Sequence, residues 1–66
     1  MKQERIAVLD IGGTRIKAGL FTEGNLTQQQ EIDTLAAQGA SAVLHRAATL
    51  LAQFIPFDAI GISTAG

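Results

Sequence analysis

Apolar and polar residues alternate with different periods along this chain, and these periods divide it into elements. An unbroken apolar run at residues 6–9 lies within a strand predicted over 5–11, and such a run is typical of a strand buried on both faces. Over residues 14–22 apolar side chains alternate with charged or small ones, which is the period of a second strand. Residues 26–34 are rich in Thr and Gln. We interpret them as a polar strand at an exposed sheet edge, with a low-complexity loop as the alternative.

The period becomes helical in the second half of the chain. Over residues 41–55 the apolar side chains recur at helical spacing and form one face, at Val43, Leu44, Ala47, Leu50, Leu51 and Phe54. Ser41 or Thr34 is the expected N-cap. Pro56 should end the helix, because the residue before a proline disfavours helical geometry. A fourth strand is predicted over residues 57–63.

These elements follow one another in the order β-β-β-α-β. Two hairpins would join the first three strands, and a right-handed helical crossover would return the fourth strand parallel to the first. The predicted fold class is therefore α/β, with a mixed sheet of strand order 3-2-1-4 and one helix packed on it. Residues 1–66 are expected to form part of one domain, since a chain of this length buries only about 60% of its unfolded surface by itself.

Composition narrows the classes of function. With 47% hydrophobic residues the chain is too apolar for a disordered tail, and a net charge of −1 gives no electrostatic footprint for nucleic acid or an anionic membrane. There is no cysteine, so the chain itself holds neither a disulfide nor a thiolate metal site. No apolar run approaches the roughly 18 residues of a membrane span, and the charged first residues are unlike a signal peptide. The expected compartment is the cytoplasm.

The most distinctive chemistry lies in the turn between the first two strands. Gly12 and Gly13 can both adopt positive φ, as a two-residue hairpin turn of the primed type requires, and their backbone amides would be open to an incoming group. Such a turn can bind phosphate through amide donors, with Thr14 adding a hydroxyl group. A strand follows the glycines, whereas a dinucleotide-binding or Walker loop leads into a helix. The alternative is that the two glycines form only a tight turn.

Three charged residues flank this turn. Asp10 stands before it, where a carboxylate could hold Mg²⁺, directly or through water, against a bound phosphate. Arg15 and Lys17 follow the turn and could add positive charge to the site. The alternatives are an ordinary turn carboxylate and ordinary solvated cations on a strand face. With the turn itself, these residues form the candidate phosphate-binding site.

Two motifs carry a resemblance to a known family. Residues 10–14, followed by Lys17 and by the Gly-Leu-Phe of residues 19–21, resemble the first phosphate motif of the ROK family of sugar kinases and repressors. That family belongs to the actin-like ATPase superfamily, so the resemblance implies an RNase-H-like fold. Residues 60–66 resemble the strand and glycine-ending turn that lead into the sugar site of these kinases. By this resemblance, Gly66 would contact the sugar through its backbone.

The resemblance implies an ATP-dependent sugar kinase, which transfers the γ-phosphate of ATP to a hexose or N-acetylhexosamine with the help of Mg²⁺. Glucokinase, fructokinase and N-acetylmannosamine kinase types are all compatible with it, and the full-length protein would be a cytoplasmic homodimer. The chain would then be the N-terminal segment. The catalytic base, the adenosine motif and a structural Zn²⁺ site would lie downstream, and the 66 residues alone would be inactive.

Two alternatives stay open. A sugar-responsive repressor of the same family would carry a helix-turn-helix before the phosphate motif, and only nine residues precede Asp10 here. The other alternative is a different actin-like ATPase.

Overall fold

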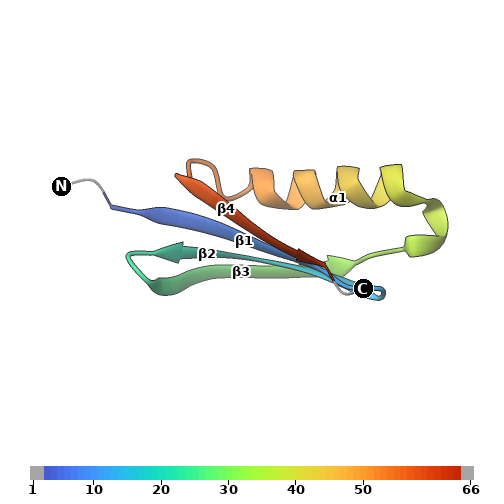
Figure 1. Ribbon diagram of the computed structural model, residues 1–66, viewed down its shortest axis with the longest axis horizontal. Coiled ribbons are helices and arrows are strands. Elements are labelled where there is room, and N and C mark those ends of the chain that lie inside the picture. The colour runs from blue at the N-terminus through green and yellow to red at the C-terminus, as the bar shows by residue number, and fades with distance from the viewer. Residues whose placement is uncertain (1–2, 65–66) are drawn as a thin grey trace.

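A computed structural model describes residues 3–64 and confirms the predicted order of elements. Figure 1 shows a long, narrow sheet with a single helical layer along one of its faces. The elements are β1 (Arg5–Ile11), β2 (Arg15–Thr22), β3 (Asn25–Asp33), the short 3₁₀ helix η1 (Ala36–Gln38), α1 (Ala40–Ala52) and β4 (Ala59–Thr64). Each predicted strand is present with bounds shifted by at most two residues.

The four strands form one mixed sheet in the order β3-β2-β1-β4, as the sequence predicted. β2 pairs antiparallel with both β1 and β3, through the two hairpins. The chain then passes through α1 and returns β4 parallel to β1. Because of this crossover, the carboxyl ends of β1 and β4 lie together at one end of the sheet, beside the glycine turn (Figure 1).

The core lies between α1 and the face of the sheet that α1 covers. Alternate residues of β1 and β2 point into it and meet two residues of α1 and one residue that follows the helix. The buried residues are Ala7, Leu9, Ile16, Ala18 and Leu20 from the sheet, Ala47 and Leu50 from α1, and Phe54 after it. The prediction that residues 6–9 are buried on both faces was only half right. Ala7 and Leu9 are buried, whereas Ile6 and Val8 are half-buried, because α1 covers only the other face.

Helix α1 is shorter than predicted, and its capping differs from the prediction. It ends at Ala52, and its N-cap is Gly39, which has a φ of 97° and provides no side-chain cap. Ser41 therefore lies inside the first turn, and the Thr34 hydroxyl bonds elsewhere. The predicted apolar face was wrong at Leu44, which is 62% exposed. No helix among the described residues is long and apolar enough to cross a membrane.

The polar segment after the second turn is an edge strand and not a loop. β3 pairs with β2 alone, and every residue in it except the half-buried Ile32 is exposed. At the opposite edge, all residues of β4 are exposed, including Ile60 and Ile62. The two edges differ in chemistry, since β3 presents mostly polar side chains and β4 presents isoleucines.

Candidate functional site

The turn between β1 and β2 is centred one residue later than predicted. The N–H of Gly12 donates to the carbonyl oxygen of Arg15 over 2.9 Å, so Gly13 and Thr14 are the central residues. Neither Gly12 nor Gly13 has a φ in the left-handed region, and the prediction of a primed turn with positive φ at both was wrong. The bond from Gly12 also means that its amide is already engaged. The amides of Gly13 and Thr14 are the candidate donors to a phosphate.

The two glycines are needed for different reasons. A Cβ at Gly12 would lie 3.0 Å from the carbonyl oxygen of Arg15, so a side chain there would crowd the bond that closes the turn. A Cβ at Gly13 would meet nothing within 4 Å. With neither crowding nor left-handed backbone, the described residues give no internal reason for glycine at this position. The space in front of Gly13 is open to an external group.

A row of four polar residues crosses the sheet beside this turn. The registers place Asp10 of β1 opposite Lys17 of β2 and Ser63 of β4, and Lys17 opposite Glu31 of β3. The Ser63 hydroxyl donates to Oδ1 of Asp10 over 3.0 Å, and Nζ of Lys17 lies 4.0 Å from Oε2 of Glu31. Because neighbouring residues of β1 point into the core, this row lies on the face opposite α1. Ser63 could not be recognised as a site residue from the sequence, since only the strand register places it beside Asp10.

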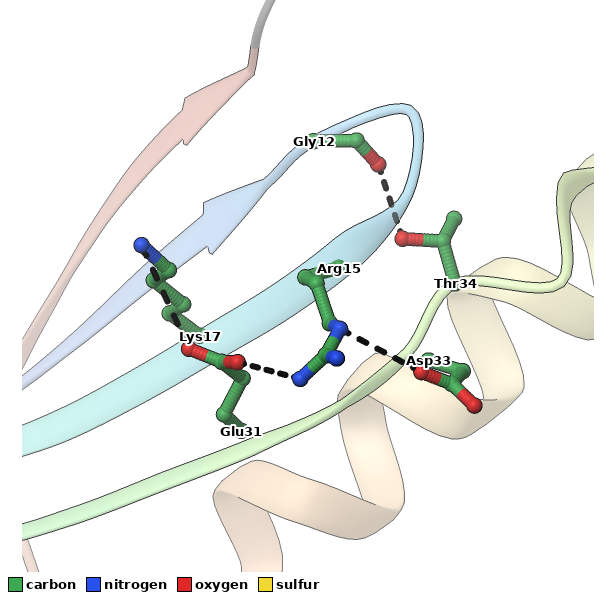
Figure 2. Close-up of polar contacts among 6 residues, drawn as sticks. All are labelled: Gly12, Arg15, Lys17, Glu31, Asp33 and Thr34. Atoms are coloured by element: carbon green, nitrogen blue, oxygen red, sulfur yellow. Dashed lines mark hydrogen bonds and ion pairs between the residues drawn. The ribbon is translucent and has the colours of Figure 1, made fainter.

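Arg15 points away from Asp10 and toward the edge strand. Its guanidinium group lies between two carboxylates, with Nη1 2.5 Å from Oε1 of Glu31 and Nε 3.4 Å from Oδ1 of Asp33 (Figure 2). Lys17 shares Glu31 with it. The positive charge beside the turn is therefore paired with negative charge, and the ion pairs are about half exposed.

A shallow hollow of about 510 Å³ extends along the same face from the polar row. Two glycines, Gly19 of β2 and Gly61 of β4, flank Val8 of β1 in the register, and neither adds a side chain to this face. Phe21 lines this hollow and does not belong to the core under α1. One end of the hollow is thus apolar, and the other end carries Asp10 and Lys17.

Among the described carboxylates near the turn, Glu31 and Asp33 form ion pairs with Arg15, which leaves Asp10 as the candidate metal ligand. Residues 3–64 contain no group of three or more His, Cys, Asp or Glu side chains able to hold a metal ion together. Mg²⁺ is commonly held by one or two carboxylates, several waters and the phosphates of a substrate, so a single carboxylate fits this ion better than it fits zinc. The predicted sugar contact, Gly66, lies outside the described residues.

Comparisons with known proteins give a relative in sequence and neighbours in fold. The chain is 36% identical over 63 residues to an N-acetylmannosamine kinase of Pasteurella multocida (strain Pm70). The match covers 94% of this chain and 21% of that protein, so the chain spans about a fifth of the relative's length. No protein-family model matches the sequence.

Two solved structures of Ppx/GppA proteins from Aquifex aeolicus share the fold. Their TM-scores are 0.62 and 0.61, each with 11% identity over 96% of this chain, and the chain covers 26% and 27% of them. At this identity the likeness concerns the fold alone, which is that of the actin-like ATPases. The sequence match confirms the resemblance of the two motifs to the ROK family of sugar kinases, and the fold agrees with that resemblance.

Proposed function

We propose that this chain provides the ATP-phosphate site of a sugar kinase that acts on a hexose or N-acetylhexosamine. The observation that carries the proposal is the open space at Gly13, in a turn that stands beside the Asp10 row. The name of the matched relative supports a kinase and favours N-acetylmannosamine or a similar N-acetylhexosamine as the substrate. The ATPase fold supports ATP as the phosphate donor.

The residues of the turn have separate roles in this proposal. The amides of Gly13 and Thr14, together with the Thr14 hydroxyl, donate hydrogen bonds to phosphate oxygens. Asp10 holds Mg²⁺, directly or through water, and Ser63 orients its carboxylate. When bound, Mg²⁺ neutralises the charge that develops on the transferred phosphoryl group. Lys17, opposite Asp10, adds positive charge to the same face.

The other parts of the reaction are assigned elsewhere in the protein. Near the turn, Glu31 and Asp33 pair with Arg15, and Asp10 is assigned to the metal. Asp58 bonds to the backbone of Arg5, at the opposite end of the sheet. The base that deprotonates the sugar hydroxyl is therefore proposed to lie outside these 66 residues, as is a zinc site. Gly66 is proposed to border the sugar, and the whole kinase to be a cytoplasmic homodimer.

Turnover by the full-length protein tests this function. ADP formation is measured with ATP and Mg²⁺ against a panel of hexoses and N-acetylhexosamines, and we expect it to depend on one of these sugars. Asp10→Asn should lower kcat about a hundredfold, because a charge aimed at the transition state is lost. Glu23→Gln is the matched control, since Glu23 is an exposed carboxylate in the other turn of β2.

Each outcome has a distinct meaning. ADP formation without any sugar would indicate another actin-like ATPase, and regulation of DNA binding by a sugar without phosphorylation would indicate a repressor. Sugar-dependent turnover that Asp10→Asn leaves unchanged would contradict the role of Asp10 while keeping the activity. The 66 residues by themselves are expected to give no turnover.

A further inference from the structure

Thr34, directly after β3, is the one polar residue that is buried among residues 3–64, with 2% of its surface exposed. The sequence placed it at the end of the predicted third strand and offered it as a helix cap, but it caps no helix. A buried hydroxyl group is costly unless it is hydrogen-bonded, so the partner of this group explains why it is there. The partner lies in the glycine turn, 22 residues earlier in the chain.

Thr34 forms hydrogen bonds to the backbone of the turn on both sides of Gly13. Its hydroxyl donates to the carbonyl oxygen of Gly12 over 2.8 Å (Figure 2). Its backbone N–H donates to the carbonyl oxygen of Thr14 over 2.9 Å. One residue therefore fixes the peptide group between Gly12 and Gly13 and the one between Thr14 and Arg15, which flank the two central residues of the turn.

These bonds also decide where the turn's amide points. The peptide bond between Gly12 and Gly13 is trans, because the one cis bond among the described residues precedes Pro56. In a planar trans peptide the N–H and the C=O point in opposite directions. With the Gly12 carbonyl held toward Thr34, the N–H of Gly13 is directed away from Thr34. Without that bond, a glycine pair would be free to rotate this peptide.

Thr34 is itself held in place by helix α1. Nε of Arg46, a half-buried residue of α1, donates to the carbonyl oxygen of Thr34 over 3.4 Å. The guanidinium group of Arg46 also bonds to the side chain of Gln38 in η1. A connected path thus runs from the helix through Thr34 to the turn.

We propose that Thr34 is a positioning residue, which aims the Gly13 amide at the phosphate before ATP arrives. Preorganisation of this kind lowers the entropic cost of binding, so its loss should weaken ATP binding more than sugar binding. The identity of the ligand in this inference rests on the proposed function, whereas the hydrogen bonds of Thr34 do not depend on it.

The test compares two threonines in the full-length protein. Thr34→Val keeps the shape and removes the hydroxyl, whereas Thr34→Ser keeps the hydroxyl. Thr27→Val is the matched control, because the Thr27 hydroxyl also donates to a backbone carbonyl, that of Leu20, over 3.1 Å, toward the other end of the hairpin. We expect Thr34→Val to raise the KM for ATP about tenfold with little change in the KM for sugar, which corresponds to one lost hydrogen bond. Thr34→Ser should stay within about twofold of the wild type.

A second measurement does not need turnover. Hydrogen exchange of the peptide that contains residues 12–15, without nucleotide, should become faster in Thr34→Val and stay unchanged in Thr27→Val. If Thr34→Val fails to fold, Arg46→Met removes the donor to the Thr34 carbonyl and should raise both the exchange rate and the KM for ATP by smaller factors. Unchanged exchange in both variants would overturn the proposal, as would an equal rise in the KM for ATP in Thr27→Val. If Thr34→Val speeds up exchange but the wild-type protein binds no ATP, ATP is not the ligand and the proposed function is wrong. The role of Thr34 in fixing the turn would still be confirmed.

Discussion

The two hairpin turns at the ends of β2 are built on opposite principles. The turn that leads into β3 uses left-handed backbone, with φ of 50° at Glu23 and 82° at Gly24, and this matches the twist of the strands that it joins. The turn that leads out of β1 has no left-handed residue among its glycines. It is held instead by Thr34, a residue from beyond the next strand.

The difference shows which turn is made for the hairpin and which for a ligand. A turn with favourable local geometry needs no support, and its glycine is explained by φ alone. At the other turn, Gly13 is explained neither by φ nor by crowding, and the backbone is fixed from outside. Gly13 and the external hydrogen bonds to this turn are not needed to form the hairpin, so we expect them to serve a bound group. Three predictions test this contrast, from the largest expected effect to the smallest.

A cavity in the core between α1 and the sheet should have the largest effect. Leu50 of α1 is 2% exposed in the core, and Leu50→Ala should lower the free energy of unfolding by roughly 2–5 kcal/mol, because it removes packed methyl groups and leaves a cavity. Leu44→Ala, on the same helix at a position that is 62% exposed, is the control and should change it by less than about 0.5 kcal/mol. Chemical denaturation of the full-length variants measures both. Equal effects would mean that α1 lies on the sheet in another orientation.

Exchanging the glycines should separate the two turns. Gly13→Val should raise the KM for ATP about ten- to a hundredfold by filling the space proposed for phosphate, with little loss of stability, since a Cβ there meets nothing. Gly24→Val should leave the KM for ATP unchanged. It should lower the free energy of unfolding by about 1–3 kcal/mol, because a β-branched residue resists a φ of 82°.

Enzyme kinetics and denaturation on the same two variants decide this prediction. If Gly13→Val destabilises the protein as much as Gly24→Val does, the first turn is only a hairpin turn. If Gly24→Val weakens ATP binding, the two turns are not independent.

The ion pairs beside the supported turn should contribute least. Arg15 lies between Glu31 and Asp33, but its side chain is 55% exposed. Arg15→Ala should therefore change the free energy of unfolding by only about 0.2–1 kcal/mol, and the difference should shrink in 1 M salt, where charges are screened within about 3 Å. Denaturation at two salt concentrations measures it. A larger and salt-independent loss would mean that Arg15, and not Thr34, supports the turn.

The sequence predicted the elements and their order because they follow from periodicity and from the rules of connection. The alternation in β2 and the helical spacing of α1 are local patterns, and the parallel return of β4 follows from the crossover. The exposure of Leu44 was not predicted, because the stripe of apolar residues on α1 is wider than the face that the helix buries.

The site was predicted less completely, because part of it is made by residues far apart in sequence. Asp10 and the glycines stand next to each other in the chain, so the motif was visible. Ser63 reaches Asp10 only through the register of β1 and β4, and Thr34 reaches Gly12 only through the course of the chain after β3. No spacing rule in one sequence encodes such contacts. The turn geometry was misassigned because two adjacent glycines permit a primed turn without requiring it.

The support of the glycine turn by Thr34 also limits how the motif can be transplanted. Residues 10–14, grafted onto another hairpin, would bring the glycines and the acidic residue but not the donor that fixes the Gly12 carbonyl. That donor and its own support from Arg46 come with the return from β3 into α1, over separations of 22 and 12 residues. The smallest portable unit is therefore not the five-residue motif but the β-β-β-α segment that carries it.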